Sequence, residues 1–105
     1  MYAKVNISNT YISLGNIQNK GLQVLTSDFT LEAKKTLIRF IENSVSQYSE
    51  FTDIIHSIYD QCINAYGGKW TISIGEINKI NSHTNADHVM AVTIGPYKII
   101  ITYCA

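Results

Sequence analysis

The chain has 105 residues, of which 46% are hydrophobic and 15% charged, so it is long enough for one globular domain and too apolar to be disordered. Eight basic side chains balance eight acidic ones, and this formal net charge of zero argues against a nucleic-acid-binding protein and against electrostatic membrane binding. No apolar run approaches the ~20 residues of a membrane-spanning helix, and the first residues lack the apolar core of a signal peptide.

The N-terminal part of the chain differs from the rest in being rich in asparagine. Apolar and polar residues alternate at Val5–Ile7, and Tyr11–Leu14 is also strand-like. Either a weak hairpin or a flexible segment fits this pattern. We therefore expect residues 1–20 to be an N-terminal extension and residues 21–105 to be the domain.

The domain begins with the pattern of a short strand followed by an amphipathic helix. Leu22–Leu25 is apolar, and the turn residues Ser27 and Asp28 end the strand. Thr30 suits the N-cap of the helix, and Glu32 lies in the first turn, where the helix dipole favours a carboxylate. The buried stripe of this helix recurs at intervals of three and four residues: Ala33, Leu37, Phe40, Ile41, Ser44, Val45 and Tyr48.

A second amphipathic helix follows directly. Ser49 can cap it, and Glu50 and Asp53 lie near its positive end. Its apolar stripe has a strict spacing of four residues: Ile54, Ile58, Cys62 and Tyr66. Gly67 and Gly68 end the helix, because the left-handed conformation after a helix favours glycine.

After these glycines the apolar pattern changes to a period of two, which indicates strands. Trp70, Ile72 and Ile74 share one face of a strand, which Gly75 interrupts. The residues from Ile77 to Thr84 alternate like a strand but are too polar to face a core. They form either a surface loop or an edge strand that pairs with another chain.

Two more strands complete the pattern. His88–Ile94 has apolar residues on both faces, as in a central strand, with Met90, Val92 and Ile94 on one face and Val89, Ala91 and Thr93 on the other. A turn at Gly95–Pro96 leads into the last strand, Tyr97–Tyr103. The element order predicts an α+β fold in which two helices pack on one face of an antiparallel sheet.

Few side chains have the spacing that catalysis or metal binding requires. His83 and His88 would lie on opposite faces of an extended strand and about 16 Å apart. His56 and Asp60 are one helical turn apart, which is more typical of a surface hydrogen bond than of a metal site with its usual three protein ligands. We therefore expect no catalytic residue, no metal and no cofactor.

The two cysteines are too few for a disulfide scaffold. Cys62 lies on the apolar stripe of the second helix, where a cysteine behaves as a small buried hydrophobe. We favour the interpretation that both thiols are reduced, as in a cytosolic protein. A single disulfide between Cys62 and Cys104 is the alternative.

From about Leu22 to Ala105, the sequence resembles the small homodimeric dynein light chains, the hub class distinct from the Tctex and roadblock light chains. The residues that carry the resemblance are Tyr48, Asp53, Ile54, Ile58, Tyr66, Trp70, Ile74, Gly75, His88, Ile94, Gly95 and Ile99–Ile101. The most specific part is the Tyr-x₃-Trp step from Tyr66 to Trp70, which is followed by a strand and a glycine.

The resemblance implies a strand-exchanged homodimer, in which the segment Asn78–Thr84 crosses over and completes the sheet of the second subunit. It further implies two grooves in which extended segments of other proteins, such as dynein intermediate chain or other clients, add as an extra strand. Such a dimer promotes the pairing of its clients in motor or other complexes without catalysis. Its expected location is the cytoplasm, in association with the cytoskeleton.

By this resemblance the groove is lined by Phe51, Thr52, Asn78, Lys79, Ile80, Asn81, Ser82, His83, Thr84, Val89, Ala91 and Thr93. The corresponding dimer interface contains Trp70, Thr71, Ile80, Ser82 and His83. Phe51 and Thr52 stand where the family has a glutamate–lysine pair that recognises a glutamine of the partner, so we expect an altered preference for the Thr-Gln-Thr type of motif. Phe51 either lines the groove or turns inward as a core residue.

Three classes of function stay open. The first is a dimeric binding hub. The second is a fixed structural subunit of one complex, with a groove that is non-functional or occluded by the strand-like residues 4–14. The third is a small enzyme or ligand carrier on an α+β scaffold.

Overall fold

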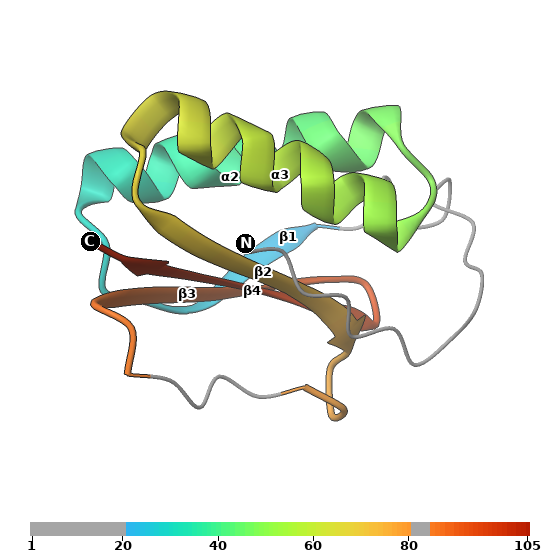
Figure 1. Cartoon of the computed structure of the whole chain (residues 1–105). Helices are drawn as coiled ribbons and strands as arrows, with labels where there is room; N and C mark the ends of the chain where they lie inside the picture. The colour runs from blue at the N-terminus through green and yellow to red at the C-terminus, as the bar shows by residue number, and fades with distance from the viewer. Residues whose placement is uncertain (1–20, 81–84) are drawn as a thin grey trace.

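The computed structural model describes residues 21–80 and 85–105; the expected N-terminal extension and residues 81–84 lie outside the described residues. The elements are β1 (Leu22–Ser27), α2 (Leu31–Gln47), α3 (Phe51–Tyr66), β2 (Lys69–Glu76), β3 (His88–Ile94) and β4 (Tyr97–Cys104). The four strands pair antiparallel in the order β1-β3-β4-β2. Both helices lie over one face of this sheet (Figure 1), which confirms the predicted α+β architecture.

The two helix starts differ in their caps. Thr30 is the N-cap of α2, as predicted, and its hydroxyl oxygen accepts a hydrogen bond from the Ala33 N–H at 3.2 Å. The predicted cap of α3 at Ser49 is wrong, because the helix begins at Phe51 and its N-cap is Glu50, which makes no side-chain cap bond. Phe51, the first residue of α3, is buried.

The strands are longer and more regular than the pattern predicts. β1 continues past Leu25 to Ser27, and β4 ends at Cys104. Gly75 does not interrupt β2, because it pairs with Lys98 and the strand continues to Glu76. β3 lies between β1 and β4, which confirms the predicted central strand.

The main core fills the layer between the helices and the sheet. The stripes of both helices and one face of each strand contribute to it, and the fully buried large side chains include Leu37, Ile41, Ile54, Ile55, Ile58, Ile72, Met90, Val92 and Ile101. Burial of about ten such side chains is the dominant stabilising contribution to a domain of this size. None of the described helices is both long enough and apolar enough to cross a bilayer.

Candidate functional site

The face of the sheet turned away from the helices, here called the outer face, has a second small apolar cluster. Ala91 of β3 and Ile100 of β4 are directly paired and each is 5% exposed. Ile80, which follows β2, packs with them, and the Lys98 ammonium donates a hydrogen bond to the Ile80 carbonyl oxygen at 3.0 Å. These contacts fix the chain after β2 against the outer face.

β2 is the less protected of the two edges of the described sheet. It pairs with β4 over eight consecutive residues without a bulge, and no other described strand pairs with it. Its charged side chains are confined to its two ends, at Lys69 and Glu76. At the opposite edge, β1 has a register shift between Val24 and Thr26. Neither strand has a charge in its interior, so the register shift of β1 makes the difference: a bulge is one of the usual protections of a sheet edge, and the regular β2 is the better template for an added strand.

The described start of the predicted crossing strand is not a strand. Asn78 and Lys79 are exposed in a turn after β2, which the hydrogen bond from the Lys79 N–H to the Glu76 carbonyl oxygen closes at 2.9 Å. Ile80 is buried in the outer-face cluster, so within this chain it does not line a groove. Asn81, Ser82, His83 and Thr84 lie outside the described residues, and strand exchange stays a prediction.

The remaining groove residues are divided between core and surface. Phe51 is 6% exposed and meets the Tyr97 ring edge-on, with centroids 5.3 Å apart, which agrees with the inward alternative, and its place in a groove stays a prediction. Thr52 beside it is exposed at the start of α3. The other three, Val89, Ala91 and Thr93, lie on the outer face, as their alternation with the buried residues of β3 predicts.

The residues of the predicted dimer interface lie in different places. Trp70 is 2% exposed, packs on the helix side of the sheet and donates its indole N–H to the Gly67 carbonyl oxygen at 2.6 Å. Its own chain therefore covers the ring, and a place for Trp70 at a dimer interface stays a prediction. The neighbouring Thr71 is half-buried and belongs to the outer face, while Ser82 and His83 lie outside the described residues.

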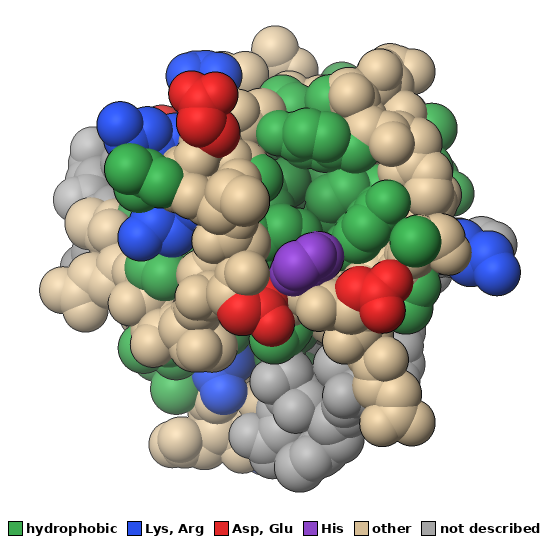
Figure 2. Space-filling model, turned by 90° about the vertical axis from the view of Figure 1, so that its left-hand side faces the viewer, with side chains coloured by type: hydrophobic (Ala, Val, Ile, Leu, Met, Phe, Trp, Pro, Cys, Tyr) green, Lys and Arg blue, Asp and Glu red, His purple; other side chains and the backbone are tan. Residues whose placement is uncertain are grey.

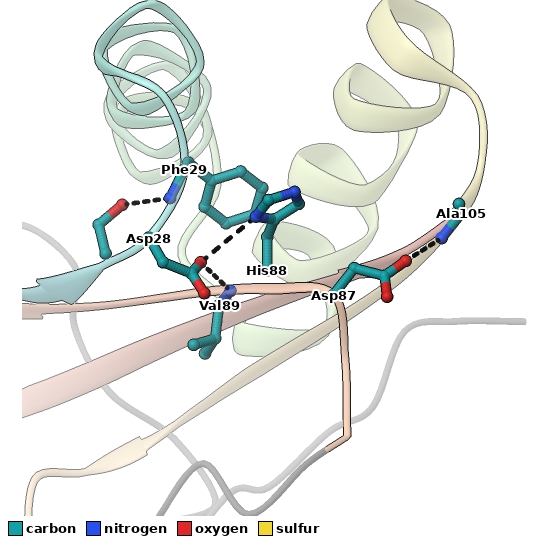
Figure 3. Close-up of polar contacts among 7 residues, drawn as sticks. Asp28, Phe29, Asp87, His88, Val89 and Ala105 are labelled. Carbon is teal, nitrogen blue, oxygen red and sulfur yellow. Dashed lines mark hydrogen bonds and ion pairs between the residues drawn. The ribbon is translucent and has the colours of Figure 1, made fainter.

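Sequence reasoning did not bring together the polar residues at the start of β3. Figure 3 shows Asp28 and Asp87 on either side of His88. The Asp28 carboxylate accepts a hydrogen bond from the Val89 N–H at 2.8 Å, and the Asp87 carboxylate accepts one from the Ala105 N–H at 2.9 Å. His88 Nδ1 lies 3.6 Å from the Asp28 carboxylate and has no hydrogen-bond partner among the described residues.

His88 lines a hollow of the surface together with aromatic rings, and Figure 2 shows a hollow among hydrophobic side chains above a histidine. The rings belong to Phe29, Tyr66, Trp70 and Tyr103, and the first turn of α2 closes the hollow, here called the aromatic pocket. The sequence indicates this pocket only through two aromatic residues, Phe29 just before the first helical pattern and Tyr66 at the end of the second. The distant partner Tyr103 becomes visible only once the sheet is formed.

The two cysteines form no bridge, and they differ in burial. Both thiols are free, so the alternative of a bridge between Cys62 and Cys104 is wrong in this structure. Burial raises the pKa of the Cys62 thiol to about 12, which keeps it protonated and unreactive at neutral pH. Among the residues that the structure describes, no group of three or more His, Cys, Asp or Glu side chains is placed to hold a metal ion.

Comparison with solved structures supports a dynein light chain-like fold. The dynein light chain-like domain of a calcium-binding protein from Fasciola hepatica superposes with a TM-score of 0.71 and 10% sequence identity, over 83% of this chain and 94% of that one. A mercury derivative of the same domain gives a TM-score of 0.68 and 9% identity, over 80% and 92%. No protein-family model matches the sequence, and no curated protein matches it. The chain is therefore a highly divergent example of this fold.

Proposed function

We propose that this chain is a non-catalytic interaction module that pairs with a second copy of itself and binds extended segments of other proteins by strand addition. The observation that carries the proposal is the edge of β2, which is regular, free of interior charge and unpaired among the described strands. The dynein light chain-like fold supports it, because the solved relative shares this arrangement of elements at the level of the fold.

The outer face supports self-association through the same region. Thr71 and Ser73 of β2 lie next to Ile100 and Thr102 of β4, so uncharged side chains extend from the edge across the middle of the face. A second sheet can pack on such a surface without desolvating a charge. Packing of the two outer faces would then hold the copies together and leave the main-chain groups of the β2 edge available to an extended partner segment.

The preference for partner sequences follows from the start of α3. Thr52 is exposed and Phe51 is buried, so the position where the family has a charged pair presents one short hydroxyl. A partner glutamine placed there would lose hydrogen-bond partners, at a cost of about 1–3 kcal/mol for a buried unpaired polar group. We expect extended segments with a small or apolar residue at this position to bind more tightly.

Light scattering tests the pairing directly. The wild-type chain should have twice the mass of the 11.8 kDa monomer. Thr71→Lys, which adds a charge to the β2 edge, should shift the protein toward the monomer. Gln23→Lys, which adds the same charge to the already bulged β1 edge, should leave the dimer unchanged. A wild-type monomer, or equal effects of the two variants, would contradict the proposal.

Peptide binding separates the hub from a fixed subunit. Labelled extended peptides that differ only at the glutamine position of a Thr-Gln-Thr core are titrated against the full chain and against a chain that starts at Lys20. Binding of several peptides, best without the glutamine, supports the hub. Binding that appears only after truncation favours the second candidate, a self-occluded groove, and equal tight binding of the glutamine peptide contradicts the altered preference.

A further inference from the structure

The aromatic pocket lies at the end of the molecule where the start of α2 and the end of α3 meet the sheet. Phe29 precedes α2, Tyr66 is the last residue of α3, and Trp70, His88 and Tyr103 come from three strands. The pocket has a volume of about 220 Å³, below the roughly 300–1,000 Å³ of sites for drug-sized ligands. Its size suits one side chain of a partner.

The rings of the pocket form a continuous aromatic lining. Trp70 is 2% exposed and forms the base of this lining, with ring centroids 4.7 Å from Tyr103, 5.8 Å from Tyr66 and 6.0 Å from Phe29. Tyr66 is 44% exposed, so its ring is open to solvent and to a ligand. The faces of aromatic rings carry negative electrostatic potential, which attracts cations.

The lining of the pocket contains one ionisable base, His88, and no lysine or arginine among the described residues. Figure 3 places the carboxylates of Asp28 and Asp87 on either side of His88, which lines the pocket, and Figure 2 shows acidic side chains on both sides of a histidine below the hollow. The carbonyl end of α3 at Tyr66 is the negative end of its helix dipole.

One nearby group favours an anion instead, the positive end of α2. One of the free N–H groups of its first turn is used, because the Thr30 hydroxyl oxygen accepts from the Ala33 N–H. Glu32 in the same turn adds a further negative charge. The sum of these contributions favours a cation.

The pocket wall depends on a glycine that permits close packing. A β-carbon at Gly68 would overlap the Tyr103 ring, and the backbone there has a φ of +82°. Tyr103 reaches its position against Trp70 only because this side chain is missing. Glycine at position 68 is therefore required for the contact between the Tyr103 and Trp70 rings.

We propose that the aromatic pocket binds the methylated ammonium group of a lysine side chain presented by a partner protein. An unmethylated ammonium is strongly hydrated and loses that hydration against apolar walls. Methyl groups replace the hydrating N–H groups and contact the rings, while the cation keeps its attraction to the ring faces and to the carboxylates of Asp28 and Asp87. This site is separate from the β2 edge and does not depend on strand addition there.

Tryptophan fluorescence of the full chain reports binding, because Trp70 is the only tryptophan. The probes are a short peptide with trimethyllysine, the same peptide with unmodified lysine, and the same peptide with the neutral carbon isostere that has a tert-butyl group. The trimethyllysine peptide should bind at least about tenfold more tightly than both others. Equal binding of the neutral isostere, tighter binding of a phosphotyrosine peptide, or no binding would overturn the proposal.

Matched variants locate the site. Tyr66→Leu removes an exposed ring face and should weaken trimethyllysine binding at least about tenfold. Asp28→Asn removes a negative charge next to His88 and should weaken the same binding severalfold. Tyr48→Leu and Asp53→Asn make the same changes at the opposite ends of the helices, outside the pocket, and should leave affinity unchanged. Unchanged binding in Tyr66→Leu, with its fold confirmed by circular dichroism, would overturn the proposal, as would equal losses in the control variants.

Discussion

The hydroxyl oxygens of Ser44 and Ser57 lie 2.7 Å apart where α2 packs against α3. The Ser44 hydroxyl donates its proton to the Phe40 carbonyl oxygen at 2.8 Å, so the Ser57 hydroxyl is the donor between the two serines. The Gln61 amide nitrogen approaches both serine oxygens, at 3.1 Å and 3.4 Å. This polar network lies within an otherwise apolar helix interface and fixes the register of the two helices.

Removal of the Ser44 hydroxyl should leave the Ser57 hydroxyl without its acceptor, while the Gln61 amide keeps its bonds to the Phe40 and Ser57 carbonyl oxygens. We expect Ser44→Ala to lower the free energy of unfolding by about 1–3 kcal/mol. The double variant Ser44→Ala/Ser57→Ala should lose less than the sum of the single variants, with a coupling of about 0.5–3 kcal/mol. Urea denaturation of the four chains measures this, and strictly additive losses would contradict the network.

The N-cap of α2 gives a second stability prediction. Thr30→Ala removes the oxygen that accepts from the Ala33 N–H and should lower the free energy of unfolding by about 1 kcal/mol. Thr36, in the same helix, bonds back to the Glu32 carbonyl oxygen from an exposed position, so Thr36→Ala should change stability by less than about 0.5 kcal/mol. Thermal unfolding of both variants checks the difference, and equal effects would exclude a capping role.

The buried thiol of Cys62 predicts a dependence on alkaline pH. Its pKa rises from the ordinary 9.0 to about 12 in the folded chain, so the unfolded chain loses this proton first as pH rises. The thiol's contribution to stability is therefore complete below pH 9 and decreases above it, by up to about 1.4 kcal/mol per pH unit. Cys62→Ala should show a shallower fall in unfolding free energy between about pH 8 and pH 10. Parallel curves for the two chains would contradict this role.

Alanine substitutions at the two glycines after α3 distinguish the cost of backbone strain from the cost of side-chain overlap. Gly67 and Gly68 both have positive φ, but only Gly68 is crowded, by the Tyr103 ring. Gly67→Ala should lose stability through backbone strain alone, about 1–3 kcal/mol. Gly68→Ala should lose more and should also change the fluorescence of Trp70, because the displaced Tyr103 ring is its nearest aromatic neighbour. An unchanged emission spectrum in Gly68→Ala would show that the ring does not move.

The sequence by itself determined the class of fold, because local patterns carry that information. The apolar spacing of both helices, the Thr30 cap, the glycines that end α3 and the two-sided apolar pattern of β3 all agree with the structure. Each depends on residues within one or two turns or within one strand, so the period of the side chains is sufficient to predict it.

Only the tertiary structure decided what each exposed or aromatic residue does. Phe51 is a core residue because Tyr97, far along the chain, covers it, and Trp70 is enclosed because Phe29 and Tyr103 meet around it. The contrast between the open edge of β2 and the bulged edge of β1 also exists only in the assembled sheet. These features arise from contacts between residues distant in sequence, whose relative positions no local periodicity specifies.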